Sequence, residues 1–259
     1  MKDLDESRAP LLDHLVELRR RLLWSVVVIV VLFFISYAFA EQILGVLVQP
    51  LKQAFPTGEG RLIFTQLYGA FFVQVKVAMF AALFLAFPVL ATQLWQFVAP
   101  GMYAKEKRAF LPFLLATPIL FGAGASLAYF VVMPTAFHFL LSFDGPVGGL
   151  QQEALPEVNG YLSMVMTFLM AFGIAFLLPV LLLILELAGF VNRAQLVAGR
   201  RYAIVGAVIV AAIATPPDVL SQLMLAGPLV LLYEGTLILM WFGERRGRRL
   251  ADRAVTTDA

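Results

Sequence analysis

The chain is 259 residues long, 61% hydrophobic and only 14% charged, with a mean hydropathy of +0.87. A water-soluble domain of this size does not bury that much apolar surface, so the composition indicates a membrane protein, and the absence of a long polar segment predicts a single domain over residues 1–259. The chain contains no cysteine, which excludes disulfides, thiolate chemistry and cysteine-ligated metals.

Six uncharged apolar runs predict an all-α membrane protein with six kinked spans in a body over residues 22–242. Most runs reach or exceed the about 20 residues that a helix needs to cross a bilayer. They are Leu22–Ala40, Val77–Ala104, Ala109–Phe143, Val158–Leu185, Tyr202–Pro217 and Val219–Tyr233.

The positive charges lie almost entirely on one side of these runs. Sixteen of the 19 lysines and arginines precede the first run, follow the sixth, or fall in the gaps after the second and fourth. The opposite side holds only Lys52, Arg61 and Lys76. This asymmetry predicts that both termini lie in the cytoplasm, with a basic tail over residues 243–259 that could touch anionic lipid headgroups.

Residues 1–21 are predicted to be a cytoplasmic N-terminal segment. Leu11, Leu15, Leu18 and Leu22 fall on one helical face, which predicts an amphipathic helix over residues 10–22 that runs into the first span and lies at the interface before the chain turns inward. The first run is long and follows an acidic, polar stretch rather than a short basic one. It is therefore expected to be a retained span and not a cleaved signal peptide.

The two longer loops differ in character. Residues 41–68 contain prolines and glycines and cannot form one helix, although their apolar content predicts a short one. Residues 142–160 are predicted to be irregular and exposed. Prolines inside the apolar runs predict kinked spans. These prolines are Pro88, Pro112, Pro118, Pro134, Pro179 and Pro228.

The fifth run is short. From Tyr202 to the break at Thr215 there is enough helix for about 20 Å of the roughly 30 Å hydrocarbon core. Either the fifth and sixth spans form a short hairpin that lets the bilayer thin locally, or frayed ends make up the difference.

Sequence motifs for catalysis and cofactor binding are absent. There is no phosphate-binding glycine loop and no zinc-protease motif, and the two histidines, His14 and His138, cannot form a cluster. We therefore predict no catalytic residues, no metal, no cofactor and no enzymatic activity. No folded basic module is present to bind nucleic acid.

Two acidic residues, Glu17 and Glu106, are predicted to lie at the cytoplasmic interface. Each could form an ion pair with a neighbour, Glu17 with Arg21 and Glu106 with Lys105 or Lys107. Alternatively, they bind a cationic ligand, since a carboxylate can hold a guanidinium through two hydrogen bonds.

Further polar residues fall within or beside the apolar runs. Glu186 either reaches water at the end of its span or has a function, whereas Glu234 lies deeper and needs a partner or a wet cavity. Thr215 and Gln222 flank the short turn after the fifth run. They could hydrogen-bond to a helix of another protein or pack within their own hairpin.

Six stretches, spread from the N-terminal segment to the sixth run, match a known family in order and spacing. They are His14–Leu22, Trp95–Tyr103, Glu106–Arg108, Ala128–Pro134, Phe168–Gly173 and Thr215–Gln222. In these stretches the chain resembles TatC, the multispanning receptor subunit of the twin-arginine protein translocase. The resemblance implies a cup-shaped, six-span protein of the bacterial cytoplasmic membrane that uses the proton-motive force.

The resemblance also implies roles for particular residues. The acids matching Glu17 and Glu106 bind the two arginines of a twin-arginine signal peptide, on folded cargo, in a patch with Leu18, Arg19 and Phe97. The resemblance further implies that the chain works in a multimeric complex. It also assigns other positions to partner contacts and to the outer caps. Thr215 and Gln222 match residues that contact the single-span proteins TatA and TatB, and Pro50 and Asp218 match positions in the outer caps.

The chain departs from the family pattern at one position. Family members often carry an acid two residues before the span-four proline, but here that proline is Pro179 and the matching residue is Leu177. Glu186 follows later, and whether it substitutes is open.

A competing hypothesis is a secondary transporter of a small solute. Glu234 and the kinked spans favour it, whereas the lack of an internal repeat and of a charged cluster at mid-membrane speaks against it.

Overall fold

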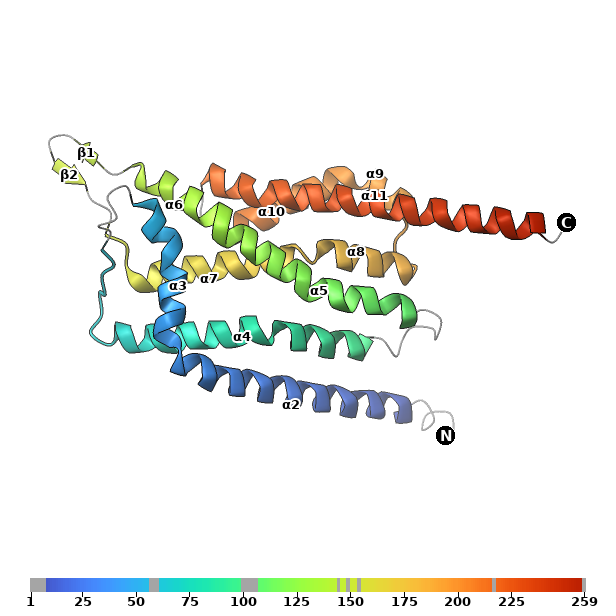
Figure 1. Cartoon of the computed structure of the whole chain (residues 1–259), viewed down its shortest axis with the longest axis horizontal. Helices are drawn as coiled ribbons and strands as arrows, with labels where there is room; N and C mark the ends of the chain where they lie inside the picture. Colours follow the sequence, from blue (N-terminus) through green and yellow to red (C-terminus); the bar gives the residue numbers. More distant parts are fainter. Residues whose placement is uncertain are drawn as a thin grey trace. The chain divides into compact units, whose positions relative to one another are not determined.

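The computed structural model describes residues 8–55, 61–98, 107–143, 145–147, 150–152, 155–215 and 218–257, most of which are helical. The elements (Figure 1) are α2 (Arg8–Ala38), α3 (Ala40–Ala54), α4 (Gly69–Val98), α5 (Lys107–Leu127), a π-helical segment (Ala128–Val132), α6 (Met133–Leu141), β1 (Gly145–Val147), β2 (Leu150–Gln152), α7 (Val158–Ala175), α8 (Leu178–Leu187), α9 (Arg193–Ala198), α10 (Arg200–Ala214) and α11 (Val219–Thr257).

Five helical stretches in the described part of the chain are long and apolar enough to cross a membrane. They are Leu15–Ala38, Gly69–Trp95, Phe113–Leu141, Val158–Leu187 and Val219–Arg245. The helix at the fifth apolar run, α10, has only 15 residues, which is about 22 Å of helix. Its shortness is confirmed, while a sixth complete crossing stays a prediction.

The helices form two compact units, which are described separately. In the first, made of residues 1–119 and 137–166, α2 packs along α4 and α3 runs across the end of this pair (Figure 1). Ala78, Ala82 and Ala86 are fully buried at four-residue spacing on α4. This line of small side chains lets a neighbouring backbone approach closely.

The start of α7 is tied to the segment that follows α2. The buried Tyr161 hydroxyl donates a 2.7 Å hydrogen bond to the Leu47 carbonyl in α3. The Ile63 amide donates to the Pro156 carbonyl and the Val158 amide donates to the Ile63 carbonyl. These bonds satisfy backbone groups outside the helices, as a polypeptide next to lipid requires.

The second unit comprises residues 120–136 and 167–259. Its α10 and α11 pack as a hairpin against which α8 and α9 also pack. Tyr233, Leu237 and Met240 are buried on α11, and the Tyr233 hydroxyl donates to the Leu196 carbonyl in α9. Asn192 begins α9 with a capping box, in which it accepts from the Gln195 amide and donates its own amide to the Gln195 side chain.

Two glycines set the distance between helices in the second unit. A Cβ on Gly124 would lie 2.3 Å from the carbonyl oxygen of Phe172, and one on Gly173 would lie 2.5 Å from the ring of Phe121. The nearby Ser126 hydroxyl donates to the carbonyl of Gly122. The glycine-rich stretch therefore serves close helix packing.

The prolines have unequal effects. The third apolar run is one helical path that changes to π geometry at Ala128–Val132, immediately before α6, which contains Pro134. The fourth run breaks between α7 and α8, two residues before Pro179. In contrast, α4 and α11 continue through Pro88 and Pro228.

Two local predictions are wrong. The helix over residues 10–22 does run into the first span, but the expected turn of the chain between them is not seen, because α2 is one helix and contains no glycine or proline after Pro10. The cytoplasmic tail over residues 243–259 stays a prediction, and α11 continues through it to Thr257. The loop over residues 142–160 is not wholly irregular, because β1 and β2 pair in an antiparallel hairpin.

The close approach at Gly124 makes a testable stability prediction. Gly124→Ala places a methyl group against a backbone oxygen that cannot rotate away, so it is expected to destabilise the protein by about 1–3 kcal/mol. Gly122→Ala, two residues earlier in the same helix, meets nothing within 4 Å and should be neutral or slightly stabilising. Thermal unfolding of the two variants in detergent checks this, and equal midpoints would contradict it.

Candidate functional site

Glu17 lies on α2 beside α4. Its Oε1 accepts hydrogen bonds from both Nε and Nη2 of Arg21, one turn later on the same helix. The Nη1 of Arg21 reaches the Oε1 of Gln93 on α4 at 3.4 Å. The Glu17 side chain is 35% exposed and that of Arg21 is 21% exposed. The structure thus shows the ion pair that was one of the two alternatives for Glu17.

Leu18 and Arg19 follow directly but lie on other faces of α2, and both are exposed. A shallow groove of about 400 Å³ runs along this part of the helix. It is lined by Val16, Arg19, Arg20, Leu23, Trp24 and Val27. The remaining members of the predicted patch lie outside the described residues: Glu106 as a whole and Phe97 for its side chain.

The residues around the α10–α11 turn bond within their own hairpin. The Thr215 hydroxyl is buried and donates to the Ala211 carbonyl at 2.8 Å. The Nε2 of Gln222 reaches the Val208 carbonyl at 3.4 Å. Asp218 begins α11, where its Oδ1 accepts from the Ser221 amide at 2.7 Å. Of the other predicted cap residue, Pro50, the structure shows that it is buried inside α3.

Glu234 has the partner that its position in an apolar run requires. Its Oε2 accepts a 2.8 Å hydrogen bond from Nη2 of Arg200, at the first residue of α10. Both side chains are more than a third exposed, so the pair reaches the surface of its unit. This pairing removes the unpartnered intramembrane charge that favoured a transporter.

Glu186 lies near the end of α8 within a second group of charges. It interacts electrostatically with Glu244 and Arg193. Arg193 in turn pairs with Glu244 at 3.6 Å and donates to the Leu237 carbonyl. Leu177, at the position where the family often has an acid, is the residue immediately before α8.

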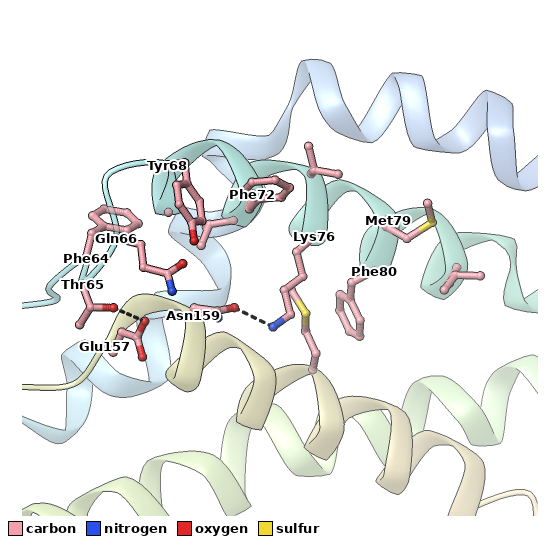
Figure 2. A pocket seen from close by; sticks show the side chains of 15 residues that line it. Phe64, Thr65, Gln66, Tyr68, Phe72, Lys76, Met79, Phe80, Glu157 and Asn159 are labelled. Atoms are coloured by element: carbon pink, nitrogen blue, oxygen red, sulfur yellow. Dashed lines mark hydrogen bonds between the residues drawn. The ribbon is translucent and has the colours of Figure 1, made fainter.

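A cavity of about 720 Å³ is a feature that the sequence did not indicate as a site (Figure 2). The Nζ of Lys76, on α4, donates to the Oδ1 of Asn159 at 2.9 Å and to the hydroxyl of Ser163, both on α7. The Thr65 hydroxyl donates to Oε1 of Glu157 at 2.7 Å. Lys76 was the available signal, since it is a charged residue within a membrane-span candidate.

No group of three or more histidine or acidic residues in the described parts of the chain could hold a metal ion. Several of the described acids instead pair with arginines, as Glu17 does with Arg21, Glu234 with Arg200 and Glu244 with Arg193.

Comparison with known proteins shows which family the chain resembles. The family model "Sec-independent protein translocase protein (TatC)" matches residues 13–228. The TatC protein of Magnetococcus marinus is 48% identical over 254 residues, which cover 98% of this chain and 91% of that protein. The TatC protein of Escherichia coli K12 is 37% identical over 243 residues, covering 94% and 92%.

A solved structure agrees. The crystal structure described as "Twin Arginine Translocase Receptor- TatC in DDM" superposes with a TM-score of 0.76 at 38% identity, covering 88% of this chain and 99% of that one. With these matches and its apolar helices, the chain belongs to the TatC family and is a multipass membrane component of the Sec-independent protein translocase.

Proposed function

We propose that the chain is the receptor subunit of the twin-arginine translocase. It binds the twin-arginine signal peptides of folded precursors at the cytoplasmic face and assembles with TatA and TatB for export driven by the proton-motive force. The proposal is supported by family membership and by the 38% identical structure whose description calls that protein a twin-arginine translocase receptor. Transport of this kind involves binding and assembly rather than catalysis.

The observation that carries the proposal is the state of the Glu17 carboxylate. One of its oxygens already accepts two hydrogen bonds from a guanidinium, that of Arg21. Its other oxygen has no partner among the described residues, and the side chain is partly exposed. Because Arg21 also contacts Gln93 on α4, the carboxylate is held in a fixed position from which it can receive a guanidinium of a ligand.

A partly exposed ion pair of this kind, within one helix, is worth about 1 kcal/mol or less. A ligand arginine can therefore share or displace Arg21 at little cost. In this proposal Glu106 receives the second arginine of the doublet, while Leu18 and Phe97 contact the apolar part of the peptide and Arg19 lies in the same patch. Two carboxylates for two guanidiniums match the charge of the ligand.

We further propose that the membrane is the bacterial cytoplasmic membrane, with both termini in the cytoplasm. Sixteen of the 19 basic residues then lie on the cytoplasmic side, as the positive-inside rule requires. On this orientation Glu17 lies at the cytoplasmic end of α2, where a peptide on an unexported precursor can reach it. The turn between α10 and α11 lies at the opposite surface.

For the contact with TatA and TatB we propose the α10–α11 hairpin. The short α10 presents exposed apolar side chains, among them Ile209 and Ile213. Beside the turn, the side-chain oxygen of Gln222 has no partner among the described residues, whereas the Thr215 hydroxyl already donates to Ala211. Gln222 is therefore the stronger contact of the two, since a polar group facing lipid gains most from a partner helix.

One test of the proposed function concerns Glu17. Glu17→Gln keeps the shape of the side chain but removes the charge, and it should weaken binding of a Ser-Arg-Arg-x-Phe-Leu-Lys peptide about tenfold or more. Binding of a labelled peptide to the full chain in nanodiscs measures this. Glu41→Gln, an exposed glutamate at the start of α3, is the matched control and should leave affinity unchanged.

Peptides with one arginine replaced by lysine make this test sharper. If Glu17 holds one particular arginine, Glu17→Gln abolishes the sensitivity to that replacement alone, and Glu106→Gln abolishes the sensitivity to the other. Equal affinities of the wild type and both variants for the twin-arginine peptide would refute the assignment.

Another test concerns the α10–α11 hairpin. Gln222→Leu should lower association with the single-span partners about three- to twentyfold, the range for one hydrogen bond between membrane helices. Thr215→Val should have a smaller effect, because its hydroxyl donates within α10. Gln74→Leu, an exposed glutamine on α4, is the control.

Crosslinking offers a direct measurement, because the chain has no cysteine of its own. A single cysteine at position 222 should form disulfides with cysteines in a partner helix, whereas one at position 74 should not. The reverse pattern, or unchanged partner association in Gln222→Leu, would refute the assignment of Gln222 as a partner contact.

A further inference from the structure

The cavity beside Lys76 is polar at one end and apolar along the rest of its length. The polar groups come from Thr65, Gln66, Glu157 and Asn159, together with Lys76. Figure 2 shows Lys76 and Phe80 pointing from α4 toward the start of α7. Farther along α4 and α7 the lining is entirely apolar, with Met79, Phe80, Leu83 and Met166.

The polar and apolar parts of the cavity are separated along the axis of α4. From Lys76 to Leu83 the axis of α4 advances about 10 Å. That part of α4 belongs to a membrane-span candidate, Gly69–Trp95, so the apolar part of the cavity lies at the depth of lipid chains and the polar part nearer the end of the span. Phe72, Met79 and Leu83 are 59%, 43% and 37% exposed, which leaves the cavity open to molecules in the bilayer.

Lys76 and Glu157 are both charged residues with only neutral hydrogen-bond partners in the described part of the chain. Lys76 donates to Asn159 and Ser163, and Glu157 accepts from Thr65. Neither forms an ion pair within 4 Å with a described residue. A partly buried ion beside an apolar wall is poorly stabilised without an opposite charge. The cavity thus offers one positive and one negative group whose charges are not neutralised by an ion pair among the described residues.

We propose that this cavity binds one zwitterionic membrane phospholipid with a phosphoethanolamine headgroup. Its phosphate accepts hydrogen bonds from the Lys76 ammonium, its primary ammonium donates to the Glu157 carboxylate, and one acyl chain lies along Phe80 and Leu83. A headgroup with both charges complements both side chains, whereas a purely anionic headgroup leaves Glu157 facing a phosphate. The volume of about 720 Å³ is in the range of small-molecule sites.

The experiment measures lipid binding to the full chain by native mass spectrometry, with phosphatidylethanolamine and phosphatidylglycerol of identical acyl chains. The wild type should prefer phosphatidylethanolamine. Lys76→Met, which removes the charge and keeps an apolar chain, should weaken both lipids about tenfold or more. Lys76→Arg keeps a phosphate donor and should retain most of the affinity.

Glu157→Gln gives the sharpest outcome, because it should act in opposite directions. It removes the partner of the ammonium and the repulsion toward an anionic headgroup, so phosphatidylethanolamine should bind more weakly and phosphatidylglycerol more tightly. A variant that merely disturbs the fold would weaken both lipids. Lys52→Met, an exposed lysine on α3 outside the cavity, is the control and should change neither.

The proposal is overturned if the wild type shows no preference between the two lipids, if Lys76→Met binds them like the wild type, or if Glu157→Gln changes both affinities in the same direction. None of these measurements involves a signal peptide or a partner protein. A failure of the lipid-site proposal can therefore be distinguished from a failure of the proposed receptor function.

Discussion

Lipid cannot hydrogen-bond to a polypeptide backbone, and this constraint shapes the whole chain. Every amide and carbonyl at membrane depth has to find its partner inside the protein, and the candidate spans in the described part of the chain are accordingly all helices. Where helices end, short-range bonds take over: the capping box at Asn192, the Asp218 cap of α11, and the bonds of Ile63 to the segment before α7. The Tyr161 hydroxyl, which donates to a carbonyl of α3, follows the same rule with a side chain.

The same low-dielectric surroundings govern the charges. Glu234 pairs with Arg200 and Glu244 with Arg193, so two of the acids in the second unit face arginines from the segment before or at α10. Glu17 pairs with Arg21 in the first unit. Each of these pairs is partly exposed, which keeps both its desolvation cost and its strength small. Lys76 and Glu157 differ, since each has only neutral partners in the described residues, and this difference is the basis for assigning them a ligand.

The sequence was informative about features that depend on composition and local spacing. The apolar runs, the shortness of α10, the need of Glu234 for a partner and the i,i+4 pair of Glu17 all follow from residues close together in the chain. The identity of the partner of Glu234 does not, because Arg200 is 34 positions away and the register of α10 against α11 is set by packing. Likewise, Lys76 and Asn159 are 83 positions apart, so no periodicity could place them in one cavity. The β1–β2 hairpin was missed because its glycines and proline resemble those of an irregular loop.

The weakness of the Glu17–Arg21 pair has a consequence for the proposed receptor function, in which the chain must also release its ligand. A carboxylate buried with a well-matched guanidinium would exclude a competing ligand arginine. An isolated carboxylate on the surface would not be held in one orientation. Glu17 lies between these extremes, since Arg21 and Gln93 restrict its position while leaving one oxygen and about a third of the side chain accessible. Affinity for a single arginine at such a site is modest, so tight binding needs a second carboxylate acting on the same peptide. Under the proposed function, a requirement for two adjacent arginines rather than one is the expected result of two weak contacts joined by a short ligand.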